Sequence, residues 1–357
     1  MKIIIKKSII ESILINTLPF LEKKDASQIT SHILFEINET HSIIRATDLE
    51  IGIEVKTQDI DIHQIGSFTV NGKKLLDIIR ILNDNEITLE LDNEVLHIKQ
   101  GKSKFKLPTF NASNFPLFPN KENKAKISLD SLALIKNLKK ITPAIDSNNP
   151  KYELNGALID IQKENTFIVG TDTRRLAIAS LTNASDNELS IIVPKKAIIE
   201  IEKLFLDQID IFYDEQELII ENDKFFIFTK LINGKFPDYN RIIPKEIKNT
   251  IEFPKKEMLD AIKKITTVSQ DINLKLTPNM VYFSSLMQNS QNLEAKTELE
   301  ININIQKELE LNFNSRYLIE FLTQIDSSTF SIGINETRLP FTVKDNNFMT
   351  IIMPIIN

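Results

Sequence analysis

The stretch VPKKAIIEIEKLF, Val193–Phe205, decides the fold because it occurs in three versions along the chain. Its apolar side chains recur at helical spacing, which predicts a short amphipathic helix with Pro194 at the first helical position. The other two versions are Val70–Leu82 and Phe313–Ile325. Their starting residues lie 123 and 120 residues apart, so three such periods nearly fill the 357 residues.

The three versions agree position by position. We number the starting residue of each version as zero. In every version the third residue after it is then basic, the fifth is apolar, the seventh is acidic and the twelfth is apolar. The basic residues are Lys73, Lys196 and Arg316, and the acidic residues are Asp77, Glu200 and Glu320. Any two amphipathic helices can be aligned, but the nearly equal spacing favours a true repeat. A repeat of this length predicts three domains, spanning residues 1–120, 121–246 and 247–357.

Each period also contains a second helix and several strands with alternating apolar residues, which predicts an α+β domain with antiparallel sheets. The predicted helices are Lys6–Leu18, Asn71–Leu82, Ser128–Ile141, Pro194–Phe205, Pro254–Val268 and Asn314–Ile325. The clearest predicted strand is Glu298–Ile305, and the last is Phe348–Ile356.

The composition argues against an enzyme. The chain has no Cys, only eight Gly without a phosphate-binding pattern, and four His without metal-ligand spacing, so we expect no catalytic group, cofactor or metal. Thr171-Asp172 has a counterpart, Thr47-Asp48, at the same place in the first period. A repeated pair is better explained as a turn than as a catalytic acid. No apolar run is long enough to span a membrane, and we expect a cytoplasmic protein.

The charge is unevenly distributed. The net charge is −6, yet five of the six predicted helices are net positive. If the helices share one surface, that surface is basic and would meet phosphates without reading sequence. The alternative, that these lysines only solvate exposed helix faces, remains open from charge alone.

The run GTDTRRLA, Gly170–Ala177, is the point at which the sequence becomes recognisable. Together with Leu154-Asn155-Gly156, Phe236-Pro237-Asp238-Tyr239 and the terminal Met353-Pro354, it resembles the bacterial DNA polymerase III beta subunit family of sliding clamps over the whole chain. The resemblance implies a head-to-tail homodimeric ring of six domains, with helices around duplex DNA and sheets outside. It implies a nucleoid-associated processivity factor.

On this resemblance, sequence-independent DNA contacts fall on basic residues of the helices and of the loop after the first helix: Lys23, Lys24, Lys73, Arg80, Lys136, Lys140, Lys195, Lys196 and Lys263.

The resemblance also implies a pocket for a short hydrophobic peptide, between the second and third domains. Its partners would be the DNA polymerase III alpha subunit, the clamp loader, other polymerases and repair proteins. The pocket residues carried over are Leu154, Thr171, Thr173, Arg174, Arg175, Leu176, Pro237, Arg241, Ile242, Pro340, Val343, Ile351, Met353, Pro354 and Ile355. We expect aliphatic walls, with arginine stems packed and their guanidinium groups in water. Thr173-Arg174 replaces the Gly-His that is frequent in the family.

For the ring joint, we expect the basic strand Ser103–Leu107 to pair with the acidic strand that starts at Glu298 in a second copy. The expected interface residues are Lys74, Lys102, Lys104, Phe105, Leu107, Glu294, Glu298 and Glu300. Lys296 and Thr297 interrupt the acidic residues of this segment, which predicts a stable but salt-sensitive dimer. The alternative function is a protein-binding scaffold that does not encircle DNA.

Overall fold

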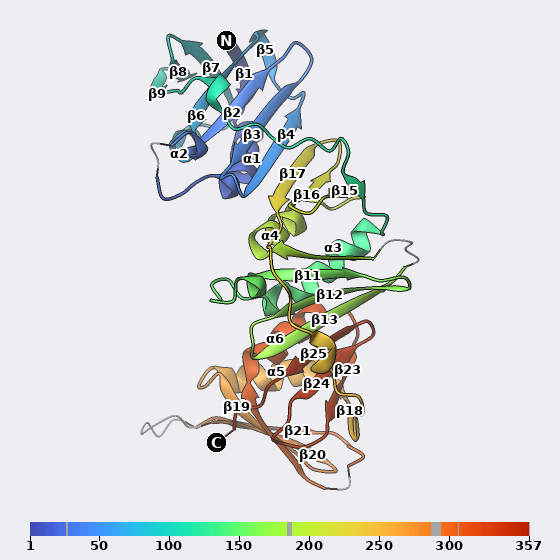
Figure 1. Ribbon diagram of the computed structural model, residues 1–357. Coiled ribbons are helices and arrows are strands. Elements are labelled where there is room, and N and C mark those ends of the chain that lie inside the picture. The colour runs from blue at the N-terminus through green and yellow to red at the C-terminus, as the bar shows by residue number, and fades with distance from the viewer. Residues whose placement is uncertain (26–27, 184–187, 287–293, 306, 357) are drawn as a thin grey trace. The chain divides into compact units, whose positions relative to one another are not determined.

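The computed structural model describes residues 1–25, 28–183, 188–286, 294–305 and 307–356 (Figure 1). It forms two compact units: Met1–Leu132 with Glu200–Leu231, and Ala133–Ile199 with Ile232–Asn357. The described residues contain six α-helices, all short, and antiparallel strands. Among the described residues, none of the helices has the length and apolar character needed to cross a bilayer.

The predicted repeat is confirmed by the order of elements, which is the same in all three thirds of the chain. A strand leads into a helix, four strands follow, and a second helix precedes three final strands. In the first third these are β1 Lys2–Lys6, α1 Lys7–Thr17, β2 His32–Ile37, β3 Ser42–Thr47, β4 Ile51–Thr57, β6 Gly66–Asn71, α2 Gly72–Ile81, β7 Glu86–Asp92, β8 Val95–Gln100 and β9 Ser103–Pro108, with an extra strand β5 Asp61–Gln64.

The other two thirds follow the same plan. The second comprises β10 Ala125–Lys126, α3 Ser131–Ile141, β11 Gly156–Ile161, β12 Asn165–Thr171, β13 Arg175–Thr182, β14 Leu189–Pro194, α4 Lys195–Leu204, β15 Asp210–Tyr213, β16 Glu217–Glu221 and β17 Phe225–Lys230. The third comprises β18 Asn249–Pro254, α5 Lys255–Thr266, β19 Asp271–Leu276, β20 Met280–Ser285, β21 Lys296–Glu300, β22 Leu309–Asn314, α6 Ser315–Gln324, β23 Thr329–Ile334, β24 Phe341–Asp345 and β25 Phe348–Ile352.

The sheets cross the limits of the repeats. In the first unit, β17 pairs with β4 to give one eight-stranded sheet, and a second sheet runs β5-β1-β7-β8-β9. In the second unit, β25 pairs with β13 to give another eight-stranded sheet, and a smaller sheet runs β21-β20-β19-β22. We call the β17–β4 pairing the first seam and the β25–β13 pairing the second seam. Both seams join the last strand of one repeat to the fourth strand of the repeat before it.

The repeated helices begin immediately where a strand ends. Asn71 and Asn314 cap α2 and α6 through their side chains, which accept from the backbone N–H groups of Lys74 and Arg316. Pro194 holds the corresponding place before α4 but is the last residue of β14, so its prediction as the first helical residue is wrong. Its backbone pairs with Gly156, which keeps it in the sheet.

Burial follows the repeat pattern. Leu75, Ile198 and Leu318, the fifth residues, are fully buried. The third residues, Lys73, Lys196 and Arg316, are all exposed. One apolar face therefore packs on the sheets and the basic position points to solvent.

Helices lie in pairs within each unit, as α1 with α2 and α5 with α6 (Figure 1). Lysines at the start of α1 and α5 cap the ends of their partner helices. Lys7 Nζ donates to the Leu82 carbonyl at 2.5 Å, and Lys255 Nζ donates to the Ile325 carbonyl at 2.6 Å. These bonds satisfy carbonyl oxygens at helix C-termini, where a cation is favourable.

Two predicted strands are shorter than expected. β21 ends at Glu300 rather than Ile305, although Ile303 and Ile305 are buried. The alternating pattern there arises from packing of irregular chain, in which Ile303 N–H donates to the Pro278 carbonyl. The final strand ends at Ile352 rather than Ile356 because Met353 and Ile355 form isolated bonds to Arg174 and Asn312 instead of a ladder.

Candidate functional site

The Thr-Asp pair forms the same turn in both places. Asp172 Oδ1 accepts from the backbone N–H groups of Arg174 and Arg175, both at 3.0 Å, and Thr171 Oγ1 donates to the Arg175 carbonyl. Asp48 Oδ1 accepts in the same way from Glu50 and Ile51. The turn interpretation is confirmed. Thr173, at φ 72°, has the left-handed conformation that disfavours a β-branched residue.

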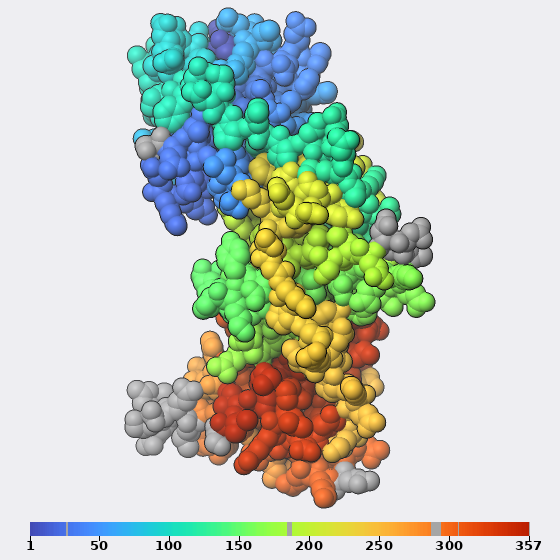
Figure 2. Space-filling model, viewed as in Figure 1, coloured from blue at the N-terminus to red at the C-terminus, as the bar shows by residue number. Residues whose placement is uncertain are grey.

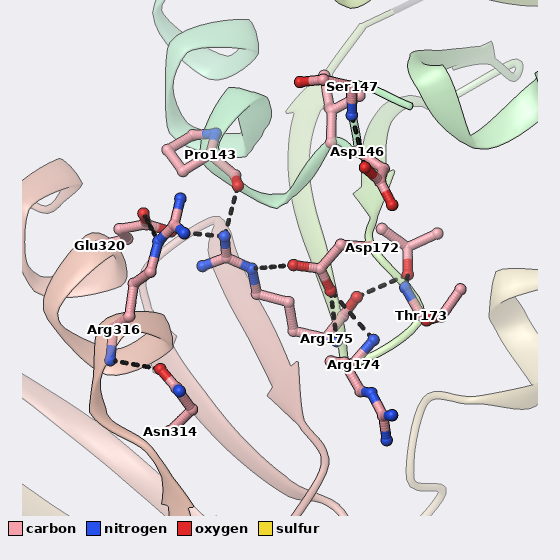
Figure 3. A network of polar contacts seen from close by, with 12 residues as sticks. Pro143, Asp146, Ser147, Asp172, Thr173, Arg174, Arg175, Asn314, Arg316 and Glu320 are labelled. Carbon is pink, nitrogen blue, oxygen red and sulfur yellow. Dashed lines mark hydrogen bonds and ion pairs between the residues drawn. The ribbon is translucent and has the colours of Figure 1, made fainter. Parts of the chain in front are cut away.

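The turn directs two adjacent arginines oppositely (Figure 3). Arg174 is exposed, whereas Arg175 is only 4% exposed. The Arg175 guanidinium meets Asp172 at 3.1 Å and Glu320 at 2.5 Å, donates to the Pro143 carbonyl, and lies over the Tyr317 ring at 4.7 Å. The expectation that arginine heads stay in water is therefore wrong for Arg175, because buried acceptors surround its head.

Beside the turn lies an apolar cluster that crosses the second seam. Leu176 in β13 is paired with Ile351 in β25, and both belong to one buried cluster with Leu154 and Tyr239. Phe236 and Tyr239 fasten the segment between the second and third repeats to this cluster. Figure 2 shows that segment, coloured yellow to orange, on the molecular surface.

Tyr239 is fixed by a polar bond beneath the cluster. Its hydroxyl donates to Asp160 Oδ2 at 2.8 Å. Burial, reinforced by this bond to the carboxylate, raises the pKa of Tyr239 above its ordinary value. The tyrosine therefore stays neutral and holds the linking segment in place.

The rim of the cluster is accessible. Met353 and Ile242 are each 43% exposed, and Met353 N–H donates to the Arg174 carbonyl at 3.0 Å. Thr173 and Arg241 are exposed, while Pro237, Pro354 and Ile355 are half-buried. The surface thus combines aliphatic side chains with charged and hydroxyl groups at its edge, which suits an apolar peptide.

Two predicted members lie apart from this cluster. Val343 is fully buried and is paired with Thr350, so the pleat directs it to the opposite sheet face from Ile351. Pro340 is half-buried just before β24. Tyr239, which belongs to the buried cluster, was not among the predicted site residues. Its sequence signal is its place in the Phe-Pro-Asp-Tyr motif.

The predicted DNA-binding residues fall into two groups. Lys23, Lys24, Lys73, Arg80, Lys196 and Lys263 are exposed. The second group makes polar contacts within the second unit: Lys136, itself exposed, with Asp326 at 2.7 Å, Lys140 with the Asn347 side chain at 3.0 Å, and Lys195 with the Ile145 carbonyl at 2.5 Å. Burial lowers the pKa of Lys140 and that of Lys195.

The predicted dimer residues lie on two sheet edges. Lys104, Phe105 and Leu107 are in β9, the outer strand of its sheet, with Lys102 in the preceding turn. Glu298 and Glu300 are in β21, also an outer strand, and Glu294 lies just before it. Lys74 is exposed on α2. Over the ranges that the structure describes, no three His, Asp or Glu side chains are grouped as a metal site would need.

Known proteins match the chain over almost its full length. Residues 1–119, 128–238 and 240–356 match the N-terminal, central and C-terminal domain models of the DNA polymerase III beta subunit. A beta sliding clamp of Helicobacter pylori is 37% identical over 354 residues, covering 97% of this chain and 94% of the relative. A beta sliding clamp of Vibrio cholerae is 27% identical, covering 92% of each.

A solved structure agrees with these matches. The crystal structure of the Helicobacter pylori beta clamp bound to a DNA ligase peptide has a TM-score of 0.92, 36% identity and full coverage of both chains. With three tandem domain matches and these relatives, the chain belongs to the DNA polymerase III beta subunit family, the bacterial beta sliding clamps.

Proposed function

We propose that this protein is a processivity factor: two copies close head to tail into a ring around duplex DNA, and partner peptides bind at the second seam. The ring has no catalytic role and acts on the nucleoid in the bacterial cytoplasm. Its domains span residues 1–120, 121–246 and 247–357.

The observation that carries this proposal is the seam pattern. The last strands β17 and β25 pair with the fourth strands β4 and β13 of the repeats before them. Among the residues that the structure describes, the last strand β9 and the fourth strand β21 have no strand paired on their outer edges. Pairing β9 of one copy with β21 of another would make a third seam of the same kind, and two copies would close the ring.

The two existing seams also predict the register of the third. Glu54 faces Phe226 in the first seam, and Ile178 faces Met349 in the second. Strand pairing within the repeats makes Lys296 the counterpart of Glu54 and Ile178. Hairpin geometry makes Lys104 the counterpart of Phe226 and Met349. We therefore place Lys104 opposite Lys296, with the favourable pairs Lys102–Glu298 and Lys106–Glu294 on either side.

The exposed basic positions support contact with DNA. Lys73, Lys196 and Arg316 occupy the same place on the three repeated helices. Because a closed ring retains DNA topologically, weak phosphate contacts are sufficient and sliding costs little. We assign Lys23, Lys24, Lys73, Arg80, Lys196 and Lys263 to this contact. Lys136, Lys140 and Lys195 would contribute charge while they hold the second unit together.

For the partner site, the exposed aliphatic rim with Met353 and Ile242, above the buried cluster that contains Leu176, would accept the apolar side chains of a peptide. The relative from Helicobacter pylori was solved with a DNA ligase peptide. We extend peptide binding to this chain, with the polymerase alpha subunit, the clamp loader and repair proteins as partners.

The decisive experiment compares circular and linear DNA. Once a cognate loader has placed the protein on nicked circular DNA, we expect co-elution with the DNA in gel filtration, and release after the DNA is cut once. Equal retention on both forms would reject encirclement and favour the alternative, a scaffold that binds peptides only.

The partner site is tested separately by peptide capture. We expect Met353→Asp to weaken capture of a DNA ligase-derived peptide at least tenfold, because it places a charge in the aliphatic surface. The control variant is Lys344→Asp, an exposed position in β24, which should capture the peptide as the wild type does. Met349 is unsuitable as a control position because it is half-buried. Unchanged capture by Met353→Asp would reject the assigned site while leaving the ring untouched.

A further inference from the structure

The acid at the seventh position of the repeated helix has different neighbours at the two seams. At the second seam this acid is Glu320, and Arg175 Nη2 lies 2.5 Å from its carboxylate. The same guanidinium donates to the Pro143 carbonyl and stacks on Tyr317. The charge of Glu320 is thus balanced within the chain (Figure 3).

At the first seam the counterpart is Glu200, which is 9% exposed. Neither its Oε2 atom nor that of Glu320 has a hydrogen-bond partner of good geometry among the residues that the structure describes, but Glu320 Oε2 has the Arg175 guanidinium at 2.5 Å. Lys203 Nζ lies 3.6 Å away, beyond hydrogen-bond distance. The counterpart of Arg175 is Ile51, which also follows the turn aspartate by three residues. The first seam therefore has the buried acid but lacks the arginine.

A cavity of about 970 Å³ lies beside this acid. Glu200 lines it together with Leu18, Pro19 and Leu76. Pro19 is in the 3₁₀ turn Leu18–Phe20 directly after α1, as Pro143 is in the turn Thr142–Ala144 directly after α3. Pro143 and Glu320, two of the groups that the Arg175 guanidinium contacts at the second seam, therefore both have counterparts that line this cavity, whereas Asp48, the counterpart of Asp172, is not one of its lining residues.

We propose that this cavity binds the guanidinium group of an arginine side chain carried by a partner polypeptide. Its aliphatic walls would pack the arginine stem, and the Glu200 carboxylate matches the planar donor fork. Four cations also line the cavity (Lys23, Lys73, Lys74 and Arg80), as do the acids Glu22 and Asp77. The four cations and Asp77 are exposed and Glu22 is half-buried, so Glu200 is the one buried charge among the lining residues that the structure describes. Arg175 at the second seam is the intramolecular model for the bound group. This inference does not depend on the role in DNA retention.

The test uses the full chain with labelled leucine and isoleucine methyl groups and N-acetyl-arginine amide as the probe. We expect saturable NMR shifts at Leu18 and Leu76, and binding about tenfold or more weaker in Glu200→Gln. N-acetyl-citrulline amide, which has the same shape without the charge, should also bind about tenfold or more weaker. Glu200→Gln should still capture the DNA ligase-derived peptide, which shows that the second seam is intact.

Equal binding of the arginine probe by Glu200→Gln, equal binding of the citrulline probe, or no shift at the cavity methyl groups would overturn the proposal. A further variant imitates the second seam. Ile51→Arg should place an internal guanidinium beside Glu200 and abolish probe binding, whereas Ile51→Leu should bind the probe as the wild type does. A folded Ile51→Arg protein that binds the probe unchanged would also overturn it. If Ile51→Arg does not fold, the result for Glu200→Gln decides.

Discussion

Arg175 and Glu320 form an ion pair of 2.5 Å between β13 of the second repeat and α6 of the third. The same carboxylate meets Arg316 at 2.7 Å, and Asp172 holds the other side of the Arg175 guanidinium. One buried arginine thus connects the turn at the proposed peptide-binding surface to the helix that carries Arg316 (Figure 3). Its contacts join the second repeat to the third within the second unit.

We expect Arg175→Ala to lower the free energy of unfolding by about 3 kcal/mol, because it leaves buried acceptors without their cation. Urea unfolding measures this. Arg174→Ala, at the exposed neighbour, should change stability by less than about 0.5 kcal/mol. If Arg175→Ala/Glu320→Ala loses as much as the two single changes together, the two side chains are not coupled.

His32 gives the first unit a dependence on pH. Its ring is 4% exposed, stacks on Phe110 with centroids 4.3 Å apart, and Nδ1 lies 3.2 Å from Thr69 Oγ1. Burial, with a smaller effect from Lys74, lowers the pKa of His32 from 6.5 to about 4. The unfolded chain therefore binds more protons between these pH values, and this contribution to stability is lost as pH falls through them.

We expect the urea midpoint of the wild type to fall more steeply than that of His32→Gln between pH 7 and pH 5. Carboxylates titrate in both proteins, so the difference between the two reports His32 alone. The His32 ring proton shifts, followed by NMR, should titrate below pH 5. A ring that titrates near pH 6.5, with parallel stability curves, would contradict the burial argument.

Thr173 has a strained backbone conformation at the rim of the proposed partner surface. Its φ of 72° costs a β-branched residue of the order of 1 kcal/mol. We expect Thr173→Gly to raise the thermal midpoint slightly, since release of strain exceeds the entropy gained by the unfolded chain. Leu49, at φ 75°, offers the matched position in the first repeat, and Leu49→Gly should act in the same direction. A lower midpoint for both variants would contradict the strain.

Local patterns predicted the elements well because they depend on residues close in sequence. The fifth residue of each repeated helix is buried and the third is exposed, as amphipathic spacing requires. Pro194 was placed wrongly because a proline suits both the first helical turn and the residue before it. Ile303 and Ile305 alternate like a strand, but they pack as irregular chain.

Long-range relations could not be predicted in this way. The partner of Arg175 is Glu320, and only the β13–β25 pairing brings the two together. The residues next to an arginine in a turn do not indicate whether its guanidinium group is exposed to solvent or buried. The sequence likewise did not predict the two seams within the chain, in which β17 pairs with β4 and β25 pairs with β13. The edge strands proposed for the dimer follow the same rule, because β9 is the last strand of a repeat and β21 is the fourth strand of a repeat.

That rule gives a prediction for the dimer. In the register derived from the two seams, Lys104 of one copy faces Lys296 of the other, which costs stability. Lys104→Glu or Lys296→Glu should each make an opposite-charge pair and tighten the dimer by up to about fivefold. Combining both changes puts two glutamates opposite each other and should return the affinity toward that of the wild type.

Sedimentation equilibrium across a dilution series measures these dissociation constants at low and high salt. The gain from each single change should shrink with added salt, because the pair is near the surface. Lys344→Glu, in β24 and outside both edge strands, controls for the change in net charge and should leave the dimer unaltered. If the double variant binds tighter than either single variant, Lys104 and Lys296 do not face each other, and the third seam has another register.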